Sequence, residues 1–85
     1  MPLICSFEGI KIYMYYIYNE HMPPHIHAFY QGNDMLVEIS SASSLSKTKI
    51  PPKIQTKIIS WVKTHKDELM DIWITQVFKK LGGNY

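Results

Sequence analysis

The sequence has little cysteine, no long apolar run and no strong excess of charge of either sign. Its one cysteine, Cys5, cannot form an internal disulfide and fits a reducing compartment. No apolar stretch approaches the ~20 residues of a membrane-spanning helix. No basic-then-apolar leader with a small-residue cleavage site is present at the start. We therefore expect a cytoplasmic protein that does not enter a membrane.

The formal net charge is +2, short of the basic excess that dedicated duplex binders usually carry. This charge permits contact with nucleic acid but does not argue for it. With 46% hydrophobic and 19% charged residues, the composition is that of a globular protein. A chain of 85 residues is long enough for one core and not for two. We expect a single domain over residues 1–85.

The first part of the chain, residues 1–39, carries the pattern of two β-hairpins. The strand-like runs are 3–7 and 10–18, joined by Glu8-Gly9, and 25–30 and 35–39, joined by residues 31–34. A glycine in each connection can take the positive φ of a tight turn. Pro23-Pro24 cannot donate to a strand ladder and lies outside the strands. The pattern predicts an antiparallel sheet of about four strands.

Two-residue turns at Glu8-Gly9 and Gly32-Asn33 sort the side chains onto two faces, because directly opposed residues share a face. The apolar face is expected to hold Leu3, Cys5, Phe7, Ile10, Ile12, Met14, Tyr16, Ile26, Ala28, Tyr30, Met35, Val37 and Ile39. The other face is expected to hold Ile4, Ser6, Lys11, Tyr13, Tyr15, Ile17, His25, His27, Phe29, Leu36, Glu38 and Ser40. In this register His27 lies opposite Glu38.

A polar, serine-rich loop over residues 40–50 precedes a helical segment over 51–81. Pro51-Pro52 suits the start of this segment, and Gly82-Gly83 suits its end. One straight helix of this length would exceed the ~30 Å width of so small a domain, so we expect a break at the capping-box sequence 64–67. The predicted fold class is α+β, with a C-terminal helix or helix pair packed on the apolar face of the sheet.

Three histidines fall within seven residues, and two of them, His25 and His27, point the same way on a strand. Together with Glu38 they form the candidate catalytic set, because imidazoles and a carboxylate suit general acid–base chemistry. The same three side chains also suit a facial metal site, and they fit an ordinary polar surface. We expect no stoichiometric metal, since this set leaves too few ligands for a closed structural site. Whether the protein is an enzyme stays open at this point, and no cofactor is predicted.

Lys11, Tyr13 and Tyr15 extend this surface onto the first hairpin, and His21 lies in the loop before Pro23. These four are the candidate binding residues. Aromatic side chains on an exposed sheet stack bases in several RNA-binding folds, and they also mark protein interfaces.

Two further residues with reactive side chains are expected to be structural. His65 falls within the apolar helical stripe and is expected to be a hydrogen-bonded core or cap histidine. Cys5 is expected to be buried and not a nucleophile.

The sequence resembles a family of small bacterial proteins, the domain-of-unknown-function family 4160. The residues that carry the resemblance are Met1-Pro2, Phe7-Glu8-Gly9-Ile10, Pro23-Pro24-His25-Ile26-His27-Ala28, Ile50-Pro51, Trp61, His65, Glu68-Leu69 and Trp73. The Pro-Pro-His-x-His run is the most specific of these. The resemblance implies a partner in a two-gene, toxin–antitoxin-type system, or a transcriptional regulator.

These observations favour a cytoplasmic component of a toxin–antitoxin-type pair that acts through the Tyr/His/Glu face, either on RNA or as a binding module. In RNA cleavage one histidine would take the 2′-hydroxyl proton, the other would protonate the leaving oxygen, and Lys11 would steady the phosphate. The competing interpretation is a non-catalytic protein-interaction or regulatory module, and a further alternative is a metal-binding domain. Expected partners are a protein encoded nearby, a second copy of the chain, or RNA.

Overall fold

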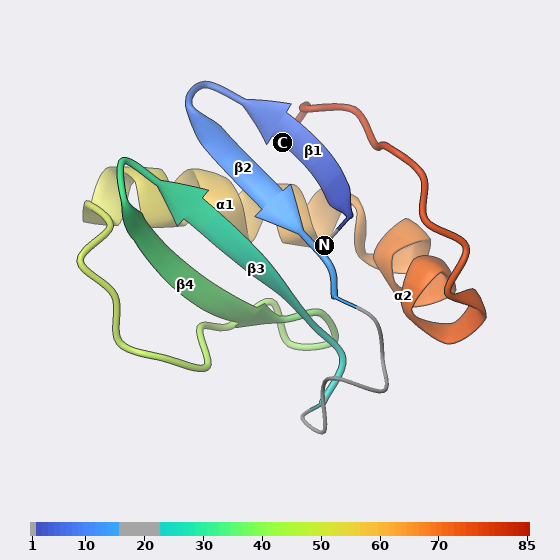
Figure 1. Ribbon diagram of the computed structural model, residues 1–85. Coiled ribbons are helices and arrows are strands. Elements are labelled where there is room, and N and C mark those ends of the chain that lie inside the picture. The colour runs from blue at the N-terminus through green and yellow to red at the C-terminus, as the bar shows by residue number, and fades with distance from the viewer. Residues whose placement is uncertain (1, 16–22) are drawn as a thin grey trace.

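A computed structural model of the protein describes residues 2–15 and 23–85. Its elements are β1 (Leu3–Phe7), β2 (Ile10–Tyr13), β3 (His25–Tyr30), β4 (Asn33–Glu38), α1 (Pro52–Thr64) and α2 (Lys66–Thr75). The strands form one antiparallel sheet in the order β1-β2-β3-β4, and two helices follow (Figure 1). The predicted α+β class, with two hairpins and a C-terminal helix pair, is confirmed.

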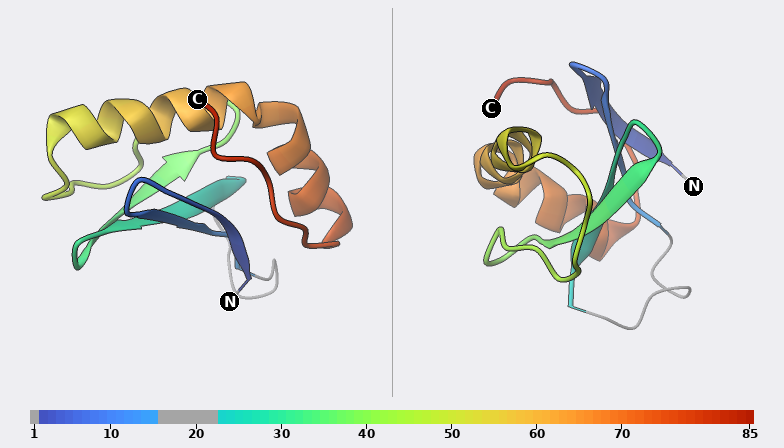
Figure 2. Two further views of the ribbon diagram at one scale, coloured as in Figure 1. Left: turned by 90° about the horizontal axis from the view of Figure 1, so that it is seen from above. Right: turned by 90° about the vertical axis from the view of Figure 1, so that its left-hand side faces the viewer.

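The helices are arranged around one side of the sheet. α1 crosses one face of the sheet, α2 turns down past one end of it, and the chain then returns beside β1 (Figure 2). This returning segment, residues 76–85, contains neither helix nor strand. No helix in the described parts of the chain is long and apolar enough to cross a membrane.

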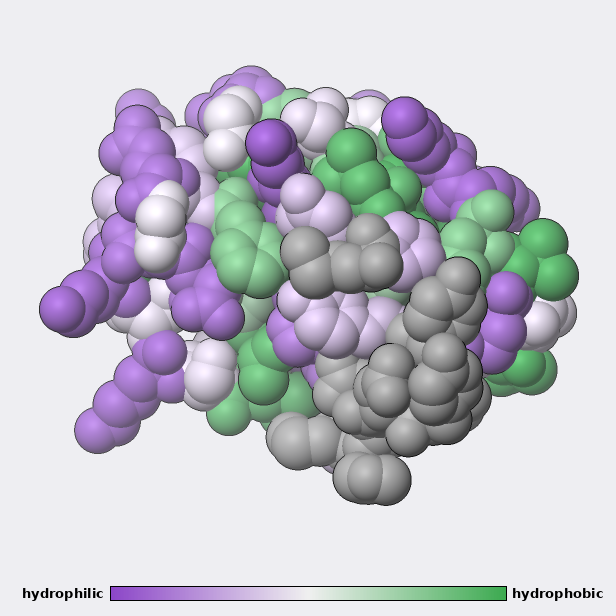
Figure 3. All heavy atoms as spheres, in the orientation of Figure 1, coloured by the Kyte–Doolittle hydropathy of each residue, from purple (hydrophilic) through white to green (hydrophobic). Residues whose placement is uncertain are grey.

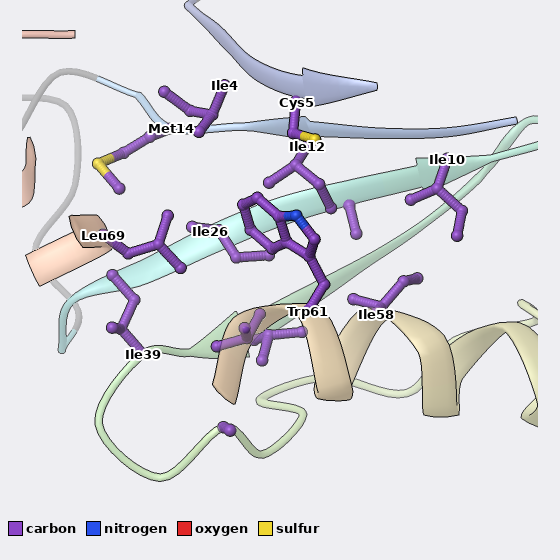
Figure 4. Packing of buried hydrophobic residues seen from close by; sticks show 14 of the residues in the cluster. Ile4, Cys5, Ile10, Ile12, Met14, Ile26, Ile39, Ile58, Trp61 and Leu69 are labelled. Atoms are coloured by element: carbon purple, nitrogen blue, oxygen red, sulfur yellow. The ribbon is translucent and has the colours of Figure 1, made fainter. Parts of the chain in front are cut away.

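The core fills the space between α1 and the sheet. Trp61 of α1 is fully buried and points toward the strands, with Cys5 and Ile12 beyond its ring (Figure 4). Trp73 of α2 is also buried, as the sequence predicts. The other buried apolar side chains include Ile10, Met14, Ile26, Ala28, Met35, Val37, Ile39, Ile50, Ile58, Val62, Leu69 and Ile72. Neither of the two helices that the structure describes lies over the opposite face of the sheet (Figure 2).

The first hairpin turns at Glu8-Gly9, as predicted, because Phe7 pairs with Ile10. The two turn residues have φ values of 49° and 81°. Positive φ at both central positions is the geometry of a type I′ turn, whose twist matches that of the flanking strands.

The second hairpin turns at Gln31-Gly32, so the predicted turn at Gly32-Asn33 is wrong. Tyr30 pairs with Asn33, and the φ values of the turn residues, 47° and 81°, repeat those of the first hairpin. Glycine again takes the second position, where φ is larger and a side chain would be strained. The correction changes the cross-strand partners by two residues, which leaves every side chain of this hairpin on its predicted face.

β1 contains a bulge between Leu3 and Cys5. A bulge interrupts the alternation of side chains, and here both Ile4 and Cys5 are buried, with exposed fractions of 0% and 4%. The prediction that Ile4 lies on the outer face is therefore wrong. A strict period of two cannot reveal an inserted residue.

The start of α1 and the break between the helices are confirmed. α1 begins at Pro52, and His65 separates it from α2. The predicted capping box is absent, since no side chain caps α2 and Thr64 Oγ1 donates back to Ser60 O at 3.0 Å. His65 is buried, and its Nδ1 lies 2.9 Å from Glu68 Oε1, which confirms its structural assignment.

α2 ends at Thr75, so the prediction of helix as far as residue 81 is wrong. Gln76 adopts the left-handed conformation with φ 59°. Beyond it, Leu81 N–H donates to Ile4 O at 2.8 Å, and Gly82 O accepts from Trp61 Nε1 at 2.8 Å. These tertiary contacts outweigh the local helical pattern, which is a weak preference per residue.

Candidate interaction surface on the sheet

The side chains that point away from α1 form a surface that we call the outer face. It consists of Lys11, Tyr13, Tyr15, His27, Phe29, Asp34, Leu36 and Glu38. These residues alternate along β2, β3 and β4 with the buried residues of the core. Figure 3 shows this side of the molecule, where residues of intermediate and apolar character gather over the strands and the most hydrophilic ones project at the margins.

Cross-strand pairing places the aromatic rings of the outer face side by side. Tyr13 of β2 pairs with His27 of β3, and Lys11 pairs with Phe29. The Tyr13 and Phe29 rings meet edge to face with centroids 5.4 Å apart. The rings of Tyr13, His27 and Phe29 are half-buried, so each presents part of its area at the surface.

Tyr15 continues the surface beyond the end of β2. Its ring stacks on the His27 ring, with centroids 4.1 Å apart and planes 11° from parallel. Both side chains are half-buried. Stacked and edge-to-face pairs of this kind add to what area burial alone contributes, so the four rings form a continuous and ordered patch.

His25 lies beside His27 as predicted, with ring centroids 5.1 Å apart, but it is buried, so the expectation that it is exposed is wrong. Only 1% of its surface is exposed, and its Nδ1–H donates to Pro23 O at 2.8 Å. Its ring also lies 5.5 Å from the Trp73 ring. The physical reason is the turn of α2 past the end of the sheet, which brings Trp73 against the start of β3.

Glu38 lies opposite His25 and not opposite His27, because the turn lies one residue before its predicted place and this shifts the cross-strand pairing by two residues. Leu36 takes the position opposite His27. Glu38 accepts a hydrogen bond from Ser41 Oγ at 2.6 Å, a partner that the sequence pattern did not single out. A contact between two side chains, one at the end of a strand and one in the following loop, has no periodic signal in the sequence.

The candidate catalytic set is therefore not assembled as the sequence predicts. General acid–base catalysis needs both groups within hydrogen-bond reach of the substrate. His27 is half-exposed, but His25 is enclosed and its Nδ1 bonds to the backbone. Within residues 2–15 and 23–85, no group of three or more His, Cys, Asp or Glu side chains is placed to hold a metal ion. His21 lies outside the described residues.

The remaining predicted binding residues do share one surface. Lys11 is exposed at the end of the outer face that is near the two turns, while Tyr13 and Tyr15 lie further along it. On the β4 side, Asp34 is exposed and Glu38 is half-exposed. The outer face thus has an aromatic centre with a cation on one side and two carboxylates on the other.

Comparison with known proteins adds a family but no activity. A family model described as "Domain of unknown function (DUF4160)" matches residues 9–74, which is most of the chain. No curated protein and no solved structure matches the chain. The matched range includes β2, β3, β4, α1 and all of α2 except Thr75, and it leaves out β1 and residues 75–85.

Proposed function

Because this chain belongs to the DUF4160 family, we propose that it is one member of a toxin–antitoxin-type two-gene pair and binds its partner protein through the outer face. The resemblance noted in the sequence is the reason to expect a dedicated partner. The observation that supports the binding role is the aromatic patch of Tyr13, Tyr15, His27 and Phe29, which lies on the sheet face opposite α1 and is covered by neither α1 nor α2. Such exposed patches usually mark interaction sites.

The composition of the outer face suits a protein partner. Interfaces are enriched in aromatic residues at their centre and are polar at their rim. Here the rings of Tyr13 and Phe29 lie centrally, and Lys11 and Asp34 are exposed at the margin. Aromatic side chains held in fixed contact lose little conformational freedom on binding, which is why they often supply most of the binding energy.

RNA is the second candidate, because half-exposed rings on a four-stranded antiparallel sheet also suit base stacking. The charges of the outer face favour RNA less than they favour a protein partner. Asp34 and Glu38 lie on the same face and would repel phosphate groups. All nine basic residues of the sequence are lysines, so no arginine is available for bidentate phosphate contacts. Cleavage of RNA by a histidine pair is not part of the proposal, since His25 is buried.

The proposal is tested by co-purifying the chain with the product of the adjacent gene and measuring their affinity by calorimetry. Tyr13→Ala should weaken the complex by roughly thirtyfold, the effect of losing about 2 kcal/mol at an interface hot spot. Lys63→Ala, an exposed change on α1 far from the outer face, should leave the affinity unchanged. Circular dichroism and thermal unfolding confirm that each variant is folded.

A parallel titration with fluorescent single-stranded RNA separates the two candidates. The protein-binding proposal predicts no more than weak binding that is insensitive to Tyr13→Ala. Tight binding of RNA that Tyr13→Ala and Lys11→Ala both weaken, without any complex with the neighbouring gene product, would favour the second candidate. A partner complex of unchanged affinity in folded Tyr13→Ala would show that the outer face is not the binding surface.

A further inference from the structure

Residues 76–85, which we call the tail, lie between β1 and α1. The tail contacts β1 through the backbone, where Leu81 N–H donates to Ile4 O at 2.8 Å. One residue later, Gly82 O accepts hydrogen bonds from Trp61 Nε1 at 2.8 Å and from Cys5 Sγ at 3.5 Å. An edge strand offers unpaired backbone groups to any extended segment that fits beside it.

The fit of the tail is specific for its own sequence. A Cβ atom at Gly83 would lie 2.8 Å from Phe7 Cβ, so the chain can pass only with glycine at this point. Beyond it, Asn84 O accepts from His65 Nε2 at 3.0 Å. The Tyr85 hydroxyl donates to Glu8 Oε2 at 2.6 Å. The tail-binding surface, made of Ile4, Cys5, Phe7, Glu8, Trp61 and His65, thus recognises an extended Leu-Gly-Gly-Asn-Tyr segment.

Gln76, which we call the hinge, leads from α2 into the tail and is in an unfavourable conformation. Gln76 has φ 59°, a left-handed conformation that residues with a side chain rarely adopt. The segment 76–81 contains neither glycine nor proline, and its pattern predicts a continued helix. Straightening the hinge would extend α2 and relieve the left-handed conformation, but it would carry the tail away from its own surface.

Two exposed apolar side chains flank the hinge. Ile74 is 72% exposed and Val77 is 67% exposed, the two largest such values among the large hydrophobic residues that the structure describes. In a dimer whose hinges are straightened, each hinge passes close to that of the other copy, and these side chains gain a place to be buried. This feature points to a second copy of the chain and not to an unrelated peptide.

We propose that the tail exchanges between two copies of this chain, so that each copy's tail occupies the tail-binding surface of the other. The contacts of residues 81–85 with the tail-binding surface are kept in such a dimer, because the two copies have the same sequence. The difference lies in the hinge, which changes from a left-handed turn into helix. The tail-binding surface is distinct from the outer face, so the proposal is independent of the function proposed above.

Two substitutions of Gln76 test this proposal, because they should shift the equilibrium between monomer and dimer in opposite directions. Glycine tolerates a positive φ and disfavours helix, so Gln76→Gly should favour the monomer, in which the tail is bound to its own chain. Alanine is strained at positive φ and favours helix, so Gln76→Ala should favour exchange. Both changes lose the same hydrogen bond, from Gln76 Nε2 to Trp73 O, and each is the control of the other. The dimer dissociation constant should differ by at least about tenfold, with Gln76→Ala the tighter dimer.

The measurement is sedimentation velocity on the full chain from micromolar to millimolar concentration, after slow refolding at high concentration. Adding Gly83→Ala to Gln76→Ala should abolish the dimer, because the tail then fits neither its own surface nor that of another copy. Adding Gly82→Ala, whose Cβ would approach only the Asn84 side chain, should leave the dimer in place. Equal association of the two Gln76 variants, or a dimer that survives Gly83→Ala, would overturn the proposal.

Discussion

His25 and His27 occupy neighbouring positions on one side of β3 but have different surroundings. The His25 ring is enclosed by Trp73 and the backbone of Pro23, whereas the His27 ring is half-exposed and stacks on Tyr15. The sequence places both on the same side of the strand, and the structure agrees. What the sequence could not show is that α2 covers one of them, because the position of α2 depends on contacts remote in the chain.

The difference predicts unequal effects of alanine substitution. His25→Ala should lower the free energy of unfolding by about 2–4 kcal/mol, since it leaves a cavity beside Trp73 and removes the donor to Pro23 O. His27→Ala should lower it by about 1 kcal/mol, mainly through the lost stack on Tyr15. Urea denaturation of both variants measures these values. Small and equal losses would contradict the buried position of His25.

The reactivity of the Cys5 thiol indicates whether the tail is bound, because the tail contacts its sulfur atom. Burial raises the pKa of its thiol above the ordinary value of 9.0, and its Sγ donates to Gly82 O. A thiol that is both covered and protonated reacts slowly with alkylating reagents. On the side of Gly82, the tail shields this sulfur atom from the reagent.

Gly83→Ala should therefore speed the alkylation of Cys5 by about tenfold or more at pH 8, while Gly82→Ala should change it little. The reason is steric: the new Cβ at residue 83 meets Phe7 Cβ at 2.8 Å, whereas at residue 82 it meets only the movable end of Asn84. Mass spectrometry of iodoacetamide-treated protein gives the rates. Matching rates for the two variants would mean that the tail does not shield Cys5.

At the scale of elements, the tail is tied to the first hairpin and to α1 by three polar side chains. Lys57 Nζ of α1 and the Tyr85 hydroxyl both donate to the Glu8 carboxylate, at 2.6 Å each. The hydrogen bond from Lys57 and then that from Tyr85 lower the pKa of Glu8 below its ordinary value of 4.5. The Glu8 carboxylate in turn raises the pKa of Tyr85 above 10.0 and that of Lys57 above 10.5.

These shifts predict a pH window for the contribution of this contact to stability. A lowered carboxyl pKa stabilises the fold fully above 4.5 and ceases to do so as the pH falls through the lowered value. A raised tyrosine pKa acts fully below 10.0, and its effect is lost as the pH rises through the raised value. Glu8→Gln should lower the melting temperature by about 2 °C inside this window and by less outside it, because the contact is exposed to solvent. Calorimetry from pH 3 to 11 checks this, and a difference that is constant with pH would contradict it.

The elements also show which parts of the fold were predictable. The strands and the start of α1 follow from periodicity, and a break near His65 follows from the length of the helical segment, although the predicted capping box does not form. The sequence does not fix the place of the second turn, because Gln31-Gly32 and Gly32-Asn33 are both acceptable turn sequences, and only the first is observed. The correct choice repeats the pattern of the first hairpin, in which glycine follows a longer residue at positive φ. The end of α2 does not follow from the local pattern, because the tail is held by residues of β1 and α1 that are far away in the sequence.

For the whole molecule, the candidate site depends on α1 packing on the opposite face of the sheet, which leaves the outer face uncovered by either described helix. The sequence predicted which side chains of β2, β3 and β4 share the outer face, because that follows from alternation. It could not predict that His25 is buried, nor that Glu38 lies opposite His25 in the register. Both depend on the register and on how α2 packs, which are properties of the folded molecule.

The last prediction concerns how the molecule opens. β2 and β3 are each paired on both sides, whereas the Leu81 amide is held by one bond to Ile4 O at the edge of the sheet. Native-state hydrogen exchange should therefore give the Leu81 amide a lower opening free energy than the amides of the β2–β3 ladder, with a weak dependence on denaturant. The ladder amides should report the global unfolding free energy.

This order of opening is what exchange of the tail requires, since the tail must leave its surface while the sheet and α1 remain folded. The expected gap is about 2 kcal/mol or more, because only the tail contacts are lost in the smaller opening. A Leu81 amide that exchanges with the same free energy and denaturant dependence as the β2–β3 ladder would mean that the tail opens only when the whole molecule unfolds. In that case the tail would be an integral part of the core, and two copies could exchange tails only by refolding together.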